Sequence, residues 1–192
     1  MKIILAGPPR SGKSCLREGL KNAIHSITKH EPYCYVLTAC PDGEGAWFQE
    51  TAFWDPALAK KCKDEYRSQF TPEFVALWAG HVRSPNLPPL TLVDIGGLVS
   101  EENRQICAAA THAILLAREQ SQFAEWDQFA DELGVKVLAR LISDYRGQED
   151  WYELMATGEL VGTVHYLERG QPTQDRPTIQ QLARMLVESV QV

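Results

Sequence analysis

The chain has 192 residues, 44% of them apolar, and a formal net charge of −6. This length suits one compact domain with its own core, so we expect a single domain over residues 1–192. The acidic balance argues against broad, unspecific binding to nucleic acid or anionic membrane, because that binding needs surplus Lys and Arg. No stretch approaches the ~18 consecutive apolar residues that cross a bilayer, and the N-terminal apolar run is too short for a signal peptide, which predicts a cytoplasmic protein.

The N-terminal segment predicts a strand, a glycine loop and a helix in succession. Residues 2–6 form a short β-branched and apolar run that ends at Gly7. From Lys13 onward the apolar residues follow helical spacing, on a stripe made of Leu16, Leu20, Ala23, Ile24 and Ile27. The loop between strand and helix, residues 7–14, matches the pattern G-x-x-x-x-G-K-S/T at every fixed position, in the context that the pattern requires.

This loop has the residue types that a site for nucleotide phosphates needs. A triphosphate crowds several negative charges together, and backbone N–H groups surround it only where no Cβ intervenes, as at Gly7 and Gly12. The helix directs its free N–H groups at the phosphates, Lys13 neutralises the β and γ oxygens and acts in catalysis, and Ser14 ligates Mg²⁺. The expected nucleotide-binding residues of the loop are Gly7, Pro8, Pro9, Arg10, Ser11, Gly12, Lys13, Ser14 and Cys15.

Residues 33–38 predict a second strand, which a polar, glycine-bearing loop follows. A P-loop kinase needs an acceptor pocket, often lined by carboxylates and aromatics from the loop after this strand. Asp42, Glu44 and Trp47 lie there and are our candidate substrate residues, although each is also an ordinary residue of an exposed loop.

A helical, aromatic-rich pattern follows over residues 47–81. Within it, Thr71 as an N-cap and Pro72 at the first helical position mark one helix start. Three prolines in residues 84–89 then break the helix, and the aromatic region is where we expect substrate specificity to be built.

The apolar run at residues 90–95 predicts a strand with Asp94 near its end. This is the form of a Walker B element, whose carboxylate holds the Mg²⁺ water shell; the alternative is a strand-end aspartate that caps a turn. Residues 94–97 also satisfy D-x-x-G, which resembles the turn with which GTPases sense the γ-phosphate. Gly96 and Gly97 therefore join the expected nucleotide-binding residues.

ATP is the expected nucleotide, with GTP as the alternative. GTPases carry an N/T-K-x-D element that selects guanine after the next strand, and here that strand continues as residues 117–120 with the sequence A-R-E-Q. Ser143 and Asp144, after the following strand, form only a fragment of such an element. A comparison of ATP and GTP affinities distinguishes the two.

Strand and helix alternate through the rest of the chain. Ser100 caps a helix that runs through Ala110, and Ser121 caps a second helix. Further strands are predicted at residues 113–117, 135–142 and 160–167, and a final amphipathic helix contains Ile179, Leu182, Leu186 and Val190. Such alternation predicts an α/β fold of the P-loop NTPase type: a three-layer sandwich with a mostly parallel sheet and a ligand at the carboxyl ends of its strands.

Two arginines are candidates for stabilising charge on a transferring phosphoryl group. Arg140 and Arg146 flank the end of the fifth predicted strand, where a lid arginine of a kinase would act. Each is also an ordinary exposed charge.

The chain resembles the P-loop NTPase superfamily, on the motifs at residues 7–14 and Asp94 and on its order of strands and helices. Residues 93–97, 100–103 and 111–115 resemble the P-loop, AAA-like domain that accompanies CRISPR-associated ring nucleases in type III systems. That second resemblance implies a partner or fused nuclease domain that acts on cyclic oligoadenylate. This chain would lack the nuclease and keep the nucleotide site.

Three functional classes stay open: a kinase for a small molecule or nucleotide, an NTPase that drives or gates a partner protein, and a nucleotide-sensing module with little turnover. Self-association is compatible with each class. Transfer of phosphoryl to an acceptor would select the first class, phosphate release stimulated by a partner the second, and binding without turnover the third.

Overall fold

The computed structural model describes residues 1–29, 31–40 and 70–190, and its strands form one sheet in the order β2-β3-β1-β4-β5-β7-β6. The strands are β1 (Lys2–Ala6), β2 (Cys34–Ala39), β3 (Leu90–Ile95), β4 (His112–Ala117), β5 (Lys136–Asp144), β6 (Trp151–Leu154) and β7 (Leu160–His165). Neighbouring strands are parallel, except that β6 runs antiparallel to β7. The mostly parallel sheet confirms the predicted α/β class.

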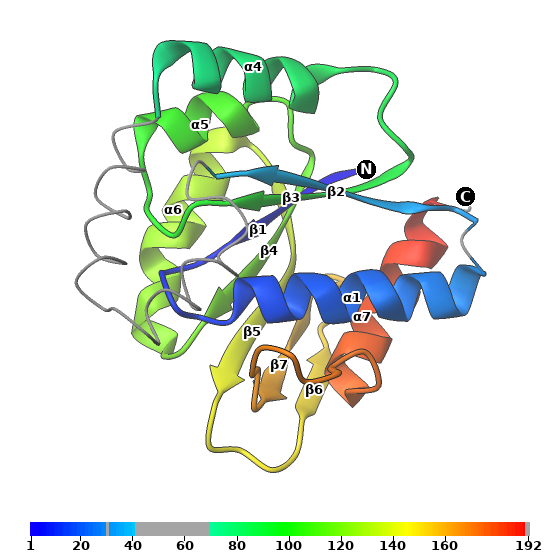
Figure 1. Cartoon of the computed structure of the whole chain (residues 1–192). Coiled ribbons are helices and arrows are strands. Elements are labelled where there is room, and N and C mark those ends of the chain that lie inside the picture. The colour runs from blue at the N-terminus through cyan, green and yellow to red at the C-terminus, as the bar shows by residue number, and fades with distance from the viewer. Residues whose placement is uncertain (30, 41–69, 191–192) are drawn as a thin grey trace.

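Helices cover both faces of this sheet (Figure 1). They are α1 (Lys13–Thr28), α4 (Pro72–Arg83), α5 (Glu101–Cys107), α6 (Phe123–Leu133) and α7 (Pro177–Val190), with a short 3₁₀ helix η1 (Gln120–Gln122) before α6. In Figure 1, α1 and α7 lie on one face, and α4, α5 and α6 on the other. Within the described ranges every helix is too short or too polar to cross a bilayer.

The core consists of two apolar clusters, one on each face of the sheet. Every residue of β3 is buried because this strand lies inside the sheet, between β2 and β1, and is covered on both faces. Its side chains alternate: Leu90 and Leu92 belong to the cluster with α1 and α7, whereas Val93 and Ile95 belong to the cluster with α4, α5 and α6. The two interior strands β1 and β3 pair directly with each other.

One local prediction was wrong, and one strand was missed. Ser121 does not cap a helix, because it lies inside η1, and α6 begins at Phe123 with no side-chain cap at Gln122. The Gln122 side chain accepts a hydrogen bond from the backbone N–H of Arg118 at 2.9 Å. Strand β6 was not predicted, because all four of its residues are exposed and show no alternation between buried and exposed positions.

Candidate functional site

The loop between β1 and α1 has a backbone that only glycine accommodates at two points. Gly7 has φ 145°, and a Cβ there would lie 1.9 Å from the backbone oxygen of Leu116 on β4. Gly12 has φ 92° and is the N-cap of α1, without a side-chain hydrogen bond to the first turn. The loop is thus pressed against β4, and no side chain at Gly12 caps the amides of the first turn of α1.

The ammonium group of Lys13 lies across this loop. Its Nζ donates hydrogen bonds to the backbone oxygens of Gly7 at 2.7 Å and Pro8 at 3.1 Å. Arg10 is exposed and has φ 62°, whereas Ser11 is buried, and its hydroxyl has no hydrogen-bond partner among the described residues. The loop therefore has the positive charge of Lys13 next to its backbone carbonyls and the positive charge of Arg10 exposed to solvent.

Asp94 lies next to the loop because β3 pairs with β1, with Asp94 opposite Leu5. Its carboxylate is buried and forms an ion pair with Arg17 of α1, at 3.2 Å between Oδ2 and Nη1. Arg17 also donates a hydrogen bond to the hydroxyl of Thr38 on β2, at 3.4 Å. Arg17 was not singled out from the sequence, although its position one helical turn after Lys13 places it near the loop.

Ser14 and Asp94 are the expected ligands of a magnesium ion. Ser14 lies in the first turn of α1, and Asp94 sits at the carboxyl end of the adjacent strand. Among residues 1–29, 31–40 and 70–190, no group of three or more His, Cys, Asp or Glu side chains could hold a metal. A site with one or two protein ligands suits Mg²⁺, which takes most of its other ligands from phosphate and water.

The turn after β3 touches the loop of residues 7–14 through one of its two glycines. A Cβ on Gly97 would lie 2.7 Å from the backbone nitrogen of Pro9, so turn and loop are in close backbone contact. Gly96 faces elsewhere, since the atoms nearest to a Cβ there belong to Asn103, Cys40 and Phe70. Of the two expected residues, the structure places Gly97 against the loop.

The arginine candidates lie in different surroundings. Arg140 is in the interior of β5, not at its end, and it forms ion pairs with Asp127 of α6 and with Glu159, the residue before β7. These pairs give Arg140 a structural role on the face of the sheet opposite α1. Arg146 is exposed in the turn after β5, and its backbone N–H donates to Asp144.

Asp42, Glu44 and Trp47, the candidate acceptor residues, lie outside the described residues. Their assignment stays a prediction.

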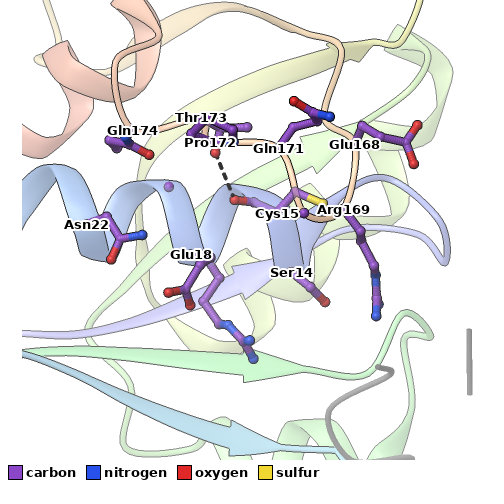
Figure 2. Close-up of a pocket in the computed structure, with 13 residues that line it drawn as sticks. Ser14, Cys15, Glu18, Asn22, Glu168, Arg169, Gln171, Pro172, Thr173 and Gln174 are labelled. Carbon is purple, nitrogen blue, oxygen red and sulfur yellow. Dashed lines mark hydrogen bonds between the residues drawn. The ribbon is translucent and has the colours of Figure 1, made fainter. Parts of the chain in front are cut away.

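A cavity of about 650 Å³ adjoins the first turns of α1. Figure 2 shows it between α1 and the segment that follows β7, with Ser14 and Cys15 at one end and Asn22 at the other. Arg17, Glu18 and Gly19 of α1 also line it, opposite residues 168–174. Nothing in the sequence pattern predicted this cavity, because residues 168–174 have no recognisable motif.

Comparisons with known proteins add little to this description. No protein-family model matches the chain, and no curated protein sequence matches it. A solved structure from Archaeoglobus fulgidus, described as a nucleotide-binding protein in complex with ADP, aligns over 96% of this chain and 86% of its own. The two are 11% identical, with a TM-score of 0.47.

Proposed function

We propose that this chain binds a nucleoside triphosphate with Mg²⁺ at residues 7–14, that the nucleotide is ATP, and that the chain hydrolyses it or transfers its γ-phosphoryl group. One observation supports this most directly. A buried strand and a helix are joined by a loop whose two glycines have positive φ, and Lys13 lies across that loop. Backbone amides and one ammonium group in this arrangement fit a chain of phosphates.

In this proposal the first turn of α1, Lys13 and Ser11 each make a different contact with the phosphates. The first-turn amides of α1 and the positive end of its dipole attract the phosphate oxygens. Lys13 can exchange its bonds to the Gly7 and Pro8 carbonyls for bonds to phosphate, because an ammonium group has three donors. The buried hydroxyl of Ser11 lacks a partner within the described residues, and a phosphate oxygen or water would supply one.

Asp94 and Ser14 would hold the magnesium ion, which neutralises phosphate charge during the reaction. Arg17 keeps the Asp94 carboxylate at the end of β3 through the ion pair described above. A metal ion at Asp94 therefore shares that carboxylate with a guanidinium group. The catalytic assignment of Lys13 and Asp94 rests on this geometry and is a proposal.

The turn after β5 favours ATP over GTP. Guanine selection in GTPases depends on the aspartate of the N/T-K-x-D element, and Asp144, at the end of β5, belongs to the fragment of such an element that this chain has. Its Oδ1 already accepts hydrogen bonds from the backbone N–H groups of Arg146 at 3.1 Å and Gly147 at 2.9 Å. A carboxylate that caps its own turn is poorly placed to accept a base, so we propose adenine as the preferred base.

Binding measurements test this proposal. We expect the parent to bind Mg²⁺–ATP more tightly than Mg²⁺–GTP, and Lys13→Ala to weaken ATP binding by about a hundredfold, because a charge-assisted phosphate contact is lost. Isothermal titration calorimetry gives the affinities, and the thermal unfolding midpoint verifies that the variant is folded. Equal ATP binding by the parent and Lys13→Ala would show that the site is elsewhere.

Turnover measurements distinguish hydrolysis, transfer and sensing. We expect Asp94→Asn to lower the rate of phosphate release by at least about tenfold in Mg²⁺, because the metal loses a charged ligand. The assay is run without acceptor, with candidate small-molecule acceptors, and with a ring nuclease of the type III class as partner. Unchanged turnover in Asp94→Asn contradicts the metal assignment, and stimulation by the nuclease would support the role of an accessory module.

A further inference from the structure

We infer that the cavity between α1 and residues 168–174 is the nucleoside pocket of the triphosphate bound at residues 7–14, and that Arg169 contacts the phosphate chain of that ligand. This inference rests on the proposed function and extends it to the part of the ligand beyond the phosphates. The volume of about 650 Å³ lies in the range of small-molecule sites and exceeds the space that a phosphate chain needs.

One wall of the pocket, the segment after β7, is held against α1 by specific contacts. Thr173 is buried, and its hydroxyl donates a hydrogen bond to the backbone oxygen of Cys15 at 3.3 Å. A Cβ on Gly19 would lie 2.2 Å from that hydroxyl, so the segment after β7 packs on α1 only because residue 19 is glycine. At the loop end, a Cβ on Gly12 would lie 2.9 Å from the Leu167 side chain. The segment is thus fixed to the helix at both places.

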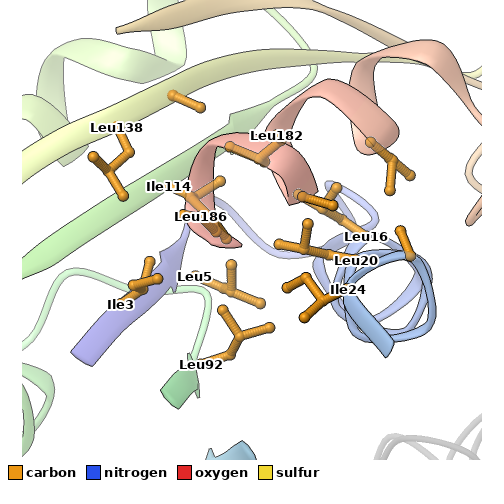
Figure 3. Close-up of a cluster of buried hydrophobic side chains, with 14 of the residues drawn as sticks. Ile3, Leu5, Leu16, Leu20, Ile24, Leu92, Ile114, Leu138, Leu182 and Leu186 are labelled. Atoms are coloured by element: carbon orange, nitrogen blue, oxygen red, sulfur yellow. The ribbon is translucent and has the colours of Figure 1, made fainter. Parts of the chain in front are cut away.

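Three sides of α1 face three different parts of the molecule. Leu16, Leu20 and Ile24 point into the core and pack with side chains of the sheet and of α7 (Figure 3). Arg17 reaches the carboxylate of Asp94 at the end of β3. Cys15, Glu18 and Asn22 line the cavity (Figure 2). Since the cavity begins at Ser14, a nucleoside that follows the phosphates out of the loop enters it directly.

The lining has the chemistry that a base and a sugar need. Asn22 and Gln171 bring side-chain amides, each with both donor and acceptor atoms, and Glu18 brings an exposed carboxylate. The edges of a purine and the hydroxyl groups of ribose likewise both donate and accept. Gly19, Gly170 and Pro172 contribute surface without long polar side chains, against which a flat ring can lie.

Arg169 stands where the phosphate chain would leave the loop. Arg169 and Ser14 both line the cavity, and Figure 2 shows them toward the same end of it. Within the described part of the chain, Arg169 makes no hydrogen bond or ion pair, so its guanidinium is available to an anion. Burial raises the pKa of the Cys15 thiol, and the nearby positive charge of Arg169 offsets part of that rise. Among the arginines considered for the phosphates, Arg169 has the placement that Arg140 lacks.

Calorimetric titrations with Mg²⁺–ATP and with Mg²⁺–tripolyphosphate test the inference, because tripolyphosphate has the phosphates without the nucleoside. We expect the parent to bind ATP at least about tenfold more tightly than tripolyphosphate. Asn22→Trp fills the cavity and should weaken ATP binding by about tenfold while tripolyphosphate binding stays within about twofold of the parent. The matched control is Ser26→Trp, an exposed α1 residue outside the lining, which should change neither affinity.

Arg169→Gln should weaken both ligands by about tenfold, since it removes a charge near the phosphates. Undiminished ATP binding by Asn22→Trp overturns the nucleoside pocket, and undiminished tripolyphosphate binding by Arg169→Gln overturns the role of Arg169. If the parent binds tripolyphosphate as tightly as ATP, the pocket assignment fails while the phosphate loop stands. If the parent binds neither ligand, the proposed function itself fails.

Discussion

Gly7 shows how one missing side chain positions the whole loop. Its φ of 145° and its contact with the Leu116 carbonyl let the chain turn sharply at the end of β1 while it touches β4. Any larger residue must move either the loop or the strand. Sterics at Gly7 therefore help to determine where the loop lies.

We predict that Gly7→Ala lowers the free energy of unfolding by at least about 2 kcal/mol, because the new Cβ collides with backbone and the φ is strained. Urea denaturation gives the value. The matched control is Gly80→Ala in α4, where a Cβ would meet nothing within 4 Å. That substitution should raise the free energy of unfolding by about 0.5–1 kcal/mol, since alanine is the better helix residue. Equal effects of the two variants would refute the steric explanation.

The local structure around residues 7–14 was predictable from the sequence. The motif has the spacing of a strand-to-helix loop, and the structure has β1 before it and α1 from Lys13 onward. Arg169, which we propose to contact the phosphates, had no such signal, because its place in the cavity arises from the packing of segments far apart in the chain. Arg140 was expected at the end of its strand, and its structural role was missed for the same reason: its partners Asp127 and Glu159 are visible only in the folded chain.

At the scale of elements, α4 begins with a side-chain cap, Thr71, that the sequence predicts. The Thr71 hydroxyl accepts a hydrogen bond from the backbone N–H of Phe74 at 3.2 Å, and Pro72 occupies the first turn. We predict that Thr71→Ala lowers the free energy of unfolding by about 1 kcal/mol, because one amide loses its partner. Thr71→Ser keeps the hydroxyl and should stay close to the parent. In equilibrium denaturation, a serine variant as unstable as the alanine variant would contradict the role of the cap.

The strands were predictable in proportion to their burial. β3 and β4 are apolar runs of strand length, because both faces of the sheet are covered there. β6 gave no such signal, since it is an edge strand with four exposed residues. The start of α6 was missed because the chain enters that helix through a 3₁₀ turn, which no capping residue marks.

At the scale of the whole molecule, two buried cysteines on opposite faces of the sheet link stability to pH. Cys34 belongs to the cluster with α1 and α7, and Cys107 to the cluster with α4, α5 and α6. Burial raises the pKa of each thiol to about 12, from an ordinary value of 9.0. The folded chain therefore retains these protons at pH values where the unfolded chain releases them.

We predict that stability contributed by these two thiols is fully present below pH 9 and is lost as the pH rises from 9 toward 12. Each thiol makes the free energy of unfolding fall by up to about 1.4 kcal/mol per pH unit in that window, since only the unfolded state loses the proton. Urea denaturation at a series of alkaline pH values measures the slope. The double variant Cys34→Ala with Cys107→Ala should show a shallower slope, and an identical slope would refute this origin.

The guanidinium of Arg17 has a consequence for the order in which ligands arrive. It stands 3.2 Å from the only carboxylate that we assign to magnesium, so a bare divalent ion that approaches Asp94 is repelled by a fixed positive charge. The same charge attracts a polyanion that already carries the ion. We therefore expect magnesium to bind together with the nucleotide, as a preformed Mg²⁺–nucleotide complex, and not to bind the protein before the nucleotide does.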